Sequence, residues 1–124
     1  MARYTDLMAT STSVATAETA MTGSPYAPKK NGRLKKVKIT LSNTAATSLI
    51  EGGYIKLTCP AFGGVDLYFP FLGTGLHTAP AQGVPIWEHD CDVMVQTGVN
   101  IAAYIFYNTT PVTPIVSLYG EFEG

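Results

Sequence analysis

The stretch KKVKITL, residues 35–41, alternates polar and apolar residues after its first lysine. Val37, Ile39 and Leu41 fall on one side of an extended chain, and lysine and threonine side chains fall on the other. Successive side chains of a β-strand point to opposite faces of its sheet. The two-residue period therefore predicts a strand with one side in a hydrophobic core and the other in water.

Similar short segments recur toward the C-terminus. Alternating or continuous apolar residues mark residues 55–59, 65–71, 84–90, 92–96, 99–107 and 115–123. Between them, the stretch 42–54 is expected to be a connection and residues 73–83 a long loop, because both are rich in polar residues and Gly. Pro70 cannot donate a hydrogen bond to a neighbouring strand, so its strand is expected at a sheet edge or a bulge.

The pattern as a whole predicts an all-β fold. An α/β fold would need helical stretches between the strands, and no helical period is evident after residue 32. Seven or eight short strands separated by Gly, Pro and Asn turns are typical of an antiparallel β-sandwich or barrel. An immunoglobulin-type sandwich is disfavoured because Trp87 comes only four residues before Cys91, rather than in a separate strand between Cys59 and Cys91.

The segment VNIAAYIFY, residues 99–107, is apolar on both sides. Ile101, Ala103 and Ile105 face one way, while Tyr104 and Phe106 face the other. A strand of this kind is expected to be covered on both sides. We expect the domain's own core on one side and a neighbouring molecule on the other.

The beginning of the chain has a different composition. Twelve of the seventeen residues at 8–24 are Ala, Thr or Ser, which is too little apolar surface for a separate core. Pro25 and Pro28 then interrupt regular structure. We therefore expect an extended N-terminal arm over residues 1–32, ordered only against other molecules, and a β-sandwich body over residues 33–124. Deleting residues 1–30 is expected to leave a folded body.

Length and composition limit the class of protein. A chain of 124 residues with 46% hydrophobic and 14% charged residues fits one folded domain. Neither a secretion signal nor a membrane-spanning run is visible, so we expect a protein made in a cytoplasm and not inserted in a membrane. A net charge of −1 gives weak self-repulsion, which permits contact between copies of the chain.

Positive charge is concentrated where the expected arm meets the first strand. Six of the eight basic residues lie there: Lys29, Lys30, Arg33, Lys35, Lys36 and Lys38. Residues 1–38 carry a formal charge of +5 and residues 39–124 a charge of −6. The cluster is a candidate for contacts between subunits, with acidic partners on an adjacent copy at Glu88, Asp90, Asp92, Glu121 and Glu123.

Two other interpretations of the cluster remain open. The lysines can protect an exposed edge strand from aggregation. They can also contact nucleic acid phosphates, an interpretation that ranks behind the others because six charges with a nearly neutral arm make a short basic run.

The segment WEHDCD, residues 87–92, is the densest set of metal-ligand residue types. In a strand its three carboxylates share one face, and His89 and Cys91 share the other. A calcium site would also need backbone carbonyls in a shaped loop. A zinc site from Cys59, His77, His89 and Cys91 lacks paired close spacings. With no nucleophile motif either, we predict no metal, no cofactor and no enzymatic activity.

The aromatic residues offer one binding hypothesis. A sugar-binding surface can be built from exposed rings, and candidates are Tyr54, Tyr68, Trp87, Tyr104 and Tyr119. Aromatic residues in strands more often belong to a core or an interface between proteins. The hypothesis therefore describes a monomeric carbohydrate-binding module as an alternative function.

The layout of an Ala/Thr/Ser-rich arm at 1–32 followed by a compact all-β body at 33–123 resembles the small single jelly-roll proteins of viral capsids and decoration proteins. The resemblance implies a jelly-roll sandwich that forms part of a virion shell, with arms reaching neighbouring subunits. Partners would be copies of the chain and other virion proteins, after synthesis in the host cytoplasm. A cellular filament or surface-layer subunit, in which the arm adds a strand to the next copy, is the alternative from the same layout.

Overall fold

The computed structural model describes residues 3–11, 17–43, 47–78, 86–107 and 114–124. Its elements are β1 (Arg3–Ser11), β2 (Thr19–Ala20), β3 (Gly32–Asn43), β4 (Thr47–Thr58), the 3₁₀ turn η1 (Pro60–Phe62), β5 (Leu67–Thr78), β6 (Ile86–Val95), β7 (Ala102–Tyr107) and β8 (Pro114–Glu123). In several strand ends, such as 47–52 and 72–78, only the backbone is described. Within these ranges no helix is long and apolar enough to cross a membrane.

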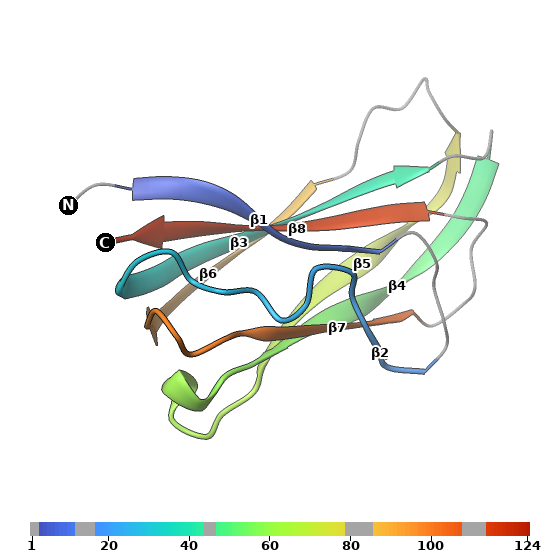
Figure 1. Cartoon of the computed structure of the whole chain (residues 1–124). Coiled ribbons are helices and arrows are strands. Elements are labelled where there is room, and N and C mark those ends of the chain that lie inside the picture. Colours follow the sequence, from blue (N-terminus) through green and yellow to red (C-terminus); the bar gives the residue numbers. More distant parts are fainter. Residues whose placement is uncertain (1–2, 12–16, 44–46, 79–85, 108–113) are drawn as a thin grey trace.

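The strands form two four-stranded antiparallel sheets that pack face to face (Figure 1). Sheet A has the order β1-β8-β3-β6, and sheet B has the order β2-β7-β4-β5. The pairing is nested: β4 pairs with β5, β3 with β6, β2 with β7 and β1 with β8. The predicted all-β antiparallel sandwich is confirmed.

The core lies between the sheets and follows the predicted alternation. Val37 and Ile39 of β3 are fully buried, as are Ile101, directly before β7, and Phe122 of β8. Each such side chain contributes roughly 1.5–3 kcal/mol when it leaves water. The apolar side of each segment therefore selects which face turns inward.

A bulge in β3 corrects a break in the alternation. Leu34 and Val37 are both fully buried although they are an odd number of residues apart. The register of β3 against β8 shifts between Leu34 and Lys36, which inserts one extra residue on β3. As a result Lys35 and Lys36 both direct their ammonium groups toward acidic residues of the outer face.

Several strand boundaries differ from those expected. Residues 84–90 and 92–96 were expected as two strands, but β6 is one strand across Ile86–Val95. The expected connection at 42–54 is mostly strand, because β4 begins at Thr47 and pairs with β5 from Thr47 onward. The expected loop at 73–83 is strand as far as Thr78. These weakly apolar residues can still form strands because the hydrogen bonds between β4 and β5 join backbone groups, which every residue here supplies. The edge position of Pro70 is confirmed, since β5 ends sheet B.

The N-terminal segment also differs from the expected free arm. In the described part of residues 1–32, β1 pairs with β8 and β2 pairs with β7. Met8, Ala9 and Met21 are almost completely buried. The segment has too few apolar residues to form a core of its own, but it completes a core that the other strands supply. Deleting residues 1–30 would therefore remove part of the core rather than leave an intact body.

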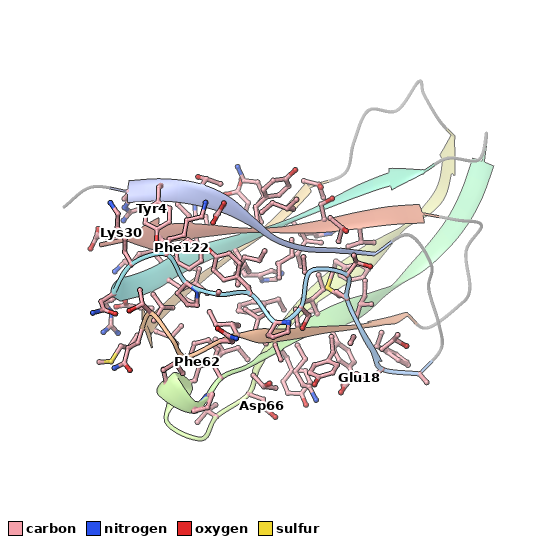
Figure 2. All side chains as sticks on the ribbon, viewed as in Figure 1. Tyr4, Glu18, Lys30, Phe62, Asp66 and Phe122 are labelled. Atoms are coloured by element: carbon pink, nitrogen blue, oxygen red, sulfur yellow. The ribbon has the colours of Figure 1, made fainter. Side chains whose placement is uncertain are left out.

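Side chains fasten this segment to the sandwich. Tyr4 and Tyr26 each stack on Phe122, with ring centroids 5.3 and 5.5 Å away. The Tyr26 hydroxyl donates a hydrogen bond of 2.6 Å to Asp6, and Lys29 lies 3.2 Å from the same carboxylate. Burial acts to raise the pKa of Asp6, but these two donors outweigh it and leave the pKa lowered. Tyr4 and Phe122 lie together beneath β1 (Figure 2).

Candidate functional site

The outer face of sheet A carries most of the charge of the chain. We call it the charged face and define it by ten described residues: Arg3, Arg33, Lys35, Lys36, Lys38, Glu88, Asp90, Asp92, Glu121 and Glu123. The basic strand β3 lies between two acidic strands, β6 and β8. The sequence does not reveal this arrangement because the three strands are far apart along the chain.

Ion pairs connect the strands of the charged face. On one side of β3, Lys36 lies 3.1 Å from Glu88 of β6. Arg33 and Lys35 both approach Asp92, and the Lys35 contact is 3.3 Å. Each of these three basic side chains of β3 therefore has an acidic partner on β6.

A separate pair of ion pairs joins β1 to β8 at the other side of the sheet. Arg3 lies 2.7 Å from Glu121 and 3.4 Å from Glu123. These contacts add the first described residue of the chain to the charged face.

The ionisation of these groups follows from the pairs. A hydrogen bond from Lys36, together with its charge, lowers the pKa of Glu88. Arg33 first and Lys35 second lower the pKa of Asp92 in the same way. Glu88 reciprocally raises the pKa of Lys36. Each pair favours its charged forms, so the face stays ionised and neutral as a whole at neutral pH.

The predicted contact residues therefore have partners within one chain. Arg33, Lys35 and Lys36 meet the acidic residues of β6, and Lys38 lies within electrostatic range of Glu88. Asp90 is 3.9 Å from Lys36 and is the most exposed of the acidic candidates.

The two candidates outside β3 also have partners in the same chain. Lys29 pairs with Asp6, and the Lys30 ammonium lies 5.7 Å from the centre of the Tyr4 ring. Contact between any of these groups and a neighbouring copy or nucleic acid stays a prediction.

The segment 87–92 has the two-sided arrangement that the sequence predicts. Glu88, Asp90 and Asp92 are exposed on the charged face, while His89 and Cys91 are half-buried. The His89 ring reaches across the sandwich, and its Nε2 donates a 2.6 Å hydrogen bond to the Pro70 carbonyl of β5. Among the described residues, no group of three or more His, Cys, Asp or Glu could hold a metal ion.

The cysteines of the zinc hypothesis are both free. Cys59 is buried and Cys91 is half-buried. Burial, reinforced by Asp90 and Asp92, raises the pKa of the Cys91 thiol to about 11. The thiol is therefore protonated and poorly nucleophilic at neutral pH. The side chain of His77, the fourth residue of that hypothesis, lies outside the described side chains.

The outer face of sheet B is aromatic instead. We call it the aromatic face and define it by Glu18, Tyr54, Lys56, Tyr68, Tyr104 and Phe106. The Tyr54 ring stacks on Phe106 at 5.2 Å and meets Tyr68 edge-on at 5.2 Å. Ile55 and Ile105 alternate with these rings on β4 and β7 and point to the opposite side of sheet B, into the core.

One ion pair fastens the aromatic face to the N-terminal segment. Glu18, which directly precedes β2, accepts a hydrogen bond of 2.7 Å from the Tyr54 hydroxyl and pairs with Lys56. The Lys56 ammonium also lies 5.0 Å from the centre of the Tyr104 ring. The donors Lys56 and then Tyr54 lower the pKa of Glu18. Figure 2 places Glu18 at the lower edge of the molecule, on the side of sheet B.

The five sugar-binding candidates do not gather on one surface. Tyr54, Tyr68 and Tyr104 lie on the aromatic face. Trp87 packs against Phe71 between the sheets, and Tyr119 lies on the outer side of sheet A. The planes of Tyr54 and Tyr68 are inclined by 66°, so they do not form the flat surface on which a sugar ring would stack.

Sequence reasoning missed the contribution of three residues to this face. Phe106 had a detectable signal, because residues 99–107 are apolar on both sides. Lys56 and Glu18 had none, since their pairing joins positions 38 residues apart and one of them lay in the expected arm.

Comparison with known proteins finds similarity in fold but not in sequence. No family model matches the sequence, and no characterised protein is significantly similar to it. Among solved structures, the chain is similar to the PRD1 vertex protein P5, with a TM-score of 0.51 and 12% sequence identity. The match covers 98% of this chain and 95% of that one. The predicted resemblance to viral jelly-roll proteins is confirmed at the level of the fold.

Proposed function

We propose that this chain is a structural subunit of a virus particle, either a capsid or a decoration protein. It assembles with copies of itself and with other virion proteins after synthesis in the host cytoplasm. The observation that carries this proposal is the fold likeness to the PRD1 vertex protein P5 over nearly the whole of both chains.

The topology supports a jelly roll within this proposal. Two sheets of four strands, in the orders β1-β8-β3-β6 and β2-β7-β4-β5, correspond to one long antiparallel ribbon that is rolled up. Rolling places consecutive strands in opposite sheets at most steps along the chain. The arrangement exposes two broad outer faces, which suits contacts with several neighbours at once.

The N-terminal segment is the second element of the proposed assembly. Within the described residues β1 has β8 as its one strand neighbour, so it occupies the edge of sheet A. In the assembled state we place the division between an arm at 1–32 and a body at 33–124, with β1 docking on β8 of a neighbouring copy. The same register and the same ion pairs from Arg3 would serve in both arrangements.

Direct genome binding is not part of the proposal. The charged face carries five basic and five acidic described side chains, and most are paired at 4 Å or less. Sequence-independent binding of phosphates needs unmatched positive charge. The face therefore offers little net attraction to a nucleic acid.

Size and shape of the purified protein test the proposal. We expect discrete oligomers or closed particles by light scattering and by negative-stain electron microscopy. Long fibres would instead support the filament or surface-layer alternative. A protein that stays monomeric at high concentration, alone and with the other proteins of its virion, would overturn the proposed function.

A further inference from the structure

The dipeptide Asn31–Gly32 lies at the point where the N-terminal segment meets β3, and the Asn31 side chain is exposed. The dipeptide borders an open hollow of about 500 Å³ between the start of β3 and the turn that follows β6. Asparagine is chemically labile, and most of all before glycine, which has no Cβ to keep its backbone nitrogen away from the asparagine side chain. The hollow gives water access to this dipeptide.

The turn after β6 holds two hydrogen-bond donors against Asn31. The Thr97 backbone nitrogen lies 2.9 Å from Oδ1 of Asn31, and the Thr97 hydroxyl lies 3.3 Å from the same atom. A backbone N–H can only donate, so the atom that it faces is the amide oxygen of Asn31 and not the amide nitrogen. Both donors are therefore placed to stabilise the negative charge that this oxygen acquires when a nucleophile attacks Cγ.

The conformation of this turn fixes the position of Thr97. The Val99 N–H donates a hydrogen bond of 3.1 Å to the Gln96 carbonyl, and Gly98 has a φ of 83°. A hydrogen bond between the first and fourth residues, with a positive φ at the third, is the pattern of a type II turn. Thr97 occupies the second position, so its N–H is held toward Asn31 by the backbone of the turn.

Gly32 is required at its position by packing. A Cβ on this residue would collide with the carbonyl oxygen of Glu123 on β8. Glycine therefore allows the two strands to approach closely, and the same residue provides an unhindered peptide nitrogen directly after Asn31. The close approach of β3 and β8 thus maintains the labile dipeptide.

We propose that Asn31 is a site of spontaneous covalent modification, activated by the two donors of Thr97. The backbone nitrogen of Gly32 loses its proton to water or hydroxide and attacks Cγ of Asn31. The bond from Cγ to Nδ2 breaks, and Nδ2 leaves as ammonia after taking a proton from water. The product is a cyclic succinimide. This inference does not depend on the proposed function.

Water then opens the succinimide at one of its two carbonyl carbons. Addition at Cγ gives aspartate, and addition at the main-chain carbonyl carbon of residue 31 gives isoaspartate. Either way, the net reaction consumes one water and releases one ammonia. No oxidant, metal or enzyme takes part.

The modification would change the junction between the N-terminal segment and β3. Either product places a carboxylate close in sequence to Lys30 and Arg33 and makes the net charge of the chain more negative by one unit. Isoaspartate also lengthens the backbone by one methylene directly before Gly32, which is closely packed against Glu123. We therefore expect the isoaspartate form to unfold at a lower temperature than the unmodified protein.

Substitutions at Thr97 test the activation. Thr97→Pro removes the N–H and the hydroxyl together and suits the second position of a type II turn, whereas Thr97→Ser keeps both donors. After incubation of the full chain at neutral pH, mass spectrometry should find aspartate and isoaspartate at residue 31 in the unmodified protein and in Thr97→Ser. In Thr97→Pro the rate should fall by at least about tenfold. Circular dichroism verifies that both variants fold.

Two references use the unmodified sequence. Asn31 should react faster in the folded chain than in the same chain unfolded in guanidinium chloride, where Thr97 is no longer held beside it. Asn100 is exposed but precedes the bulky Ile101, so it should stay unmodified. The rate at Asn31 should rise with pH because the attacking nitrogen must lose its proton. If unfolding accelerates the reaction, or if folded Thr97→Pro reacts as fast as the unmodified protein, the donors only hold the turn in place and the proposal is wrong.

Discussion

The two outer faces of the sandwich are built on strands with the same alternation but differ in how they satisfy their side chains. On the charged face, each strand presents charges that the next strand neutralises, as Lys36 does with Glu88. On the aromatic face the rings pack against one another, as Phe106 does with Tyr54. The Tyr68 side chain stays about half exposed to water. One face is complete within a single chain, and the other gains from further burial.

This difference bears on how strongly each face would bind a partner. Exposed ion pairs contribute little stability because water and salt compete with them. A half-buried ring still has apolar surface in water, and burying that surface against a partner would be favourable. On these grounds we expect the basic cluster to bind a partner less strongly than the aromatic face, and its predicted contacts stay a prediction.

The largest effect should come from substituting the inner side of β8, which holds β1 in sheet A. Phe122 is fully buried between Tyr4 and Tyr26, so Phe122→Ala should lower the free energy of unfolding by about 3–5 kcal/mol. Loss of β1 would also remove Arg3 from the charged face. Urea unfolding measures the loss, and limited proteolysis near residues 3–11 reports release of the strand.

The matched control for this variant lies on the same strand. Tyr119→Ala removes a ring from the outer side of β8 and should lower the free energy of unfolding by about 1 kcal/mol or less. Equal effects at the two positions would contradict the assignment of inner and outer sides of sheet A.

A smaller effect should separate the two outer faces directly. Phe106→Ala removes the ring that stacks on Tyr54, and it should lower the free energy of unfolding by about 1–2 kcal/mol. The loss should persist at high salt because it reflects apolar contact. Lys36→Ala on the charged face should cost less, and its cost should disappear as salt screens the pair. Chemical unfolding at low and high ionic strength checks both, and a salt-sensitive Phe106→Ala would contradict the comparison.

The smallest effect concerns acid. The pKa values of Glu88 and Asp92 are lower in the folded chain than in the unfolded one. Their contribution to stability is therefore complete above the unfolded pKa values, near pH 4, and is lost as pH falls through the folded values. The double variant Glu88→Gln with Asp92→Asn should be less sensitive to acid below about pH 5 than the unmodified protein. Thermal unfolding across this range measures the difference, and identical pH profiles would show that the pairs do not contribute.

The strands of the body were predictable because their signal is local. The alternation at Val37 and Ile39 depends on neighbouring residues, and both side chains are buried as expected. The same reasoning placed Tyr104 and Phe106 on the side opposite Ile101 and Ile105, but it did not decide which side faces the core. Strand lengths were less predictable, since the extension of β4 back to Thr47 depends on pairing with β5 rather than on its own sequence.

Partnerships between distant segments were beyond the reach of sequence reasoning. The charge patterns of β3 and β6 were both evident, but their register, with Lys38 opposite Glu88, depends on the topology. The contacts of the N-terminal segment with its own chain were not predicted, for the same reason. Met8 and Met21 are sparse anchors by composition, yet each fills a place in a core made by other strands. A prediction from local apolar content misses such residues because the side chains that bury them come from distant parts of the sequence.

The nested pairing has a consequence for how the chain is made. Arg3 pairs with Glu123, so β1 is synthesised well before β8 and can dock in sheet A only after β8 has been made. The innermost pair, β4 with β5, is complete much earlier. The later strands β6, β7 and β8 then pair in turn with β3, β2 and β1. Contacts between residues so far apart in sequence form slowly. During synthesis β1 is thus unpaired until β8 follows, and in the proposed assembly this interval would let β1 dock either on its own β8 or on that of a neighbouring copy.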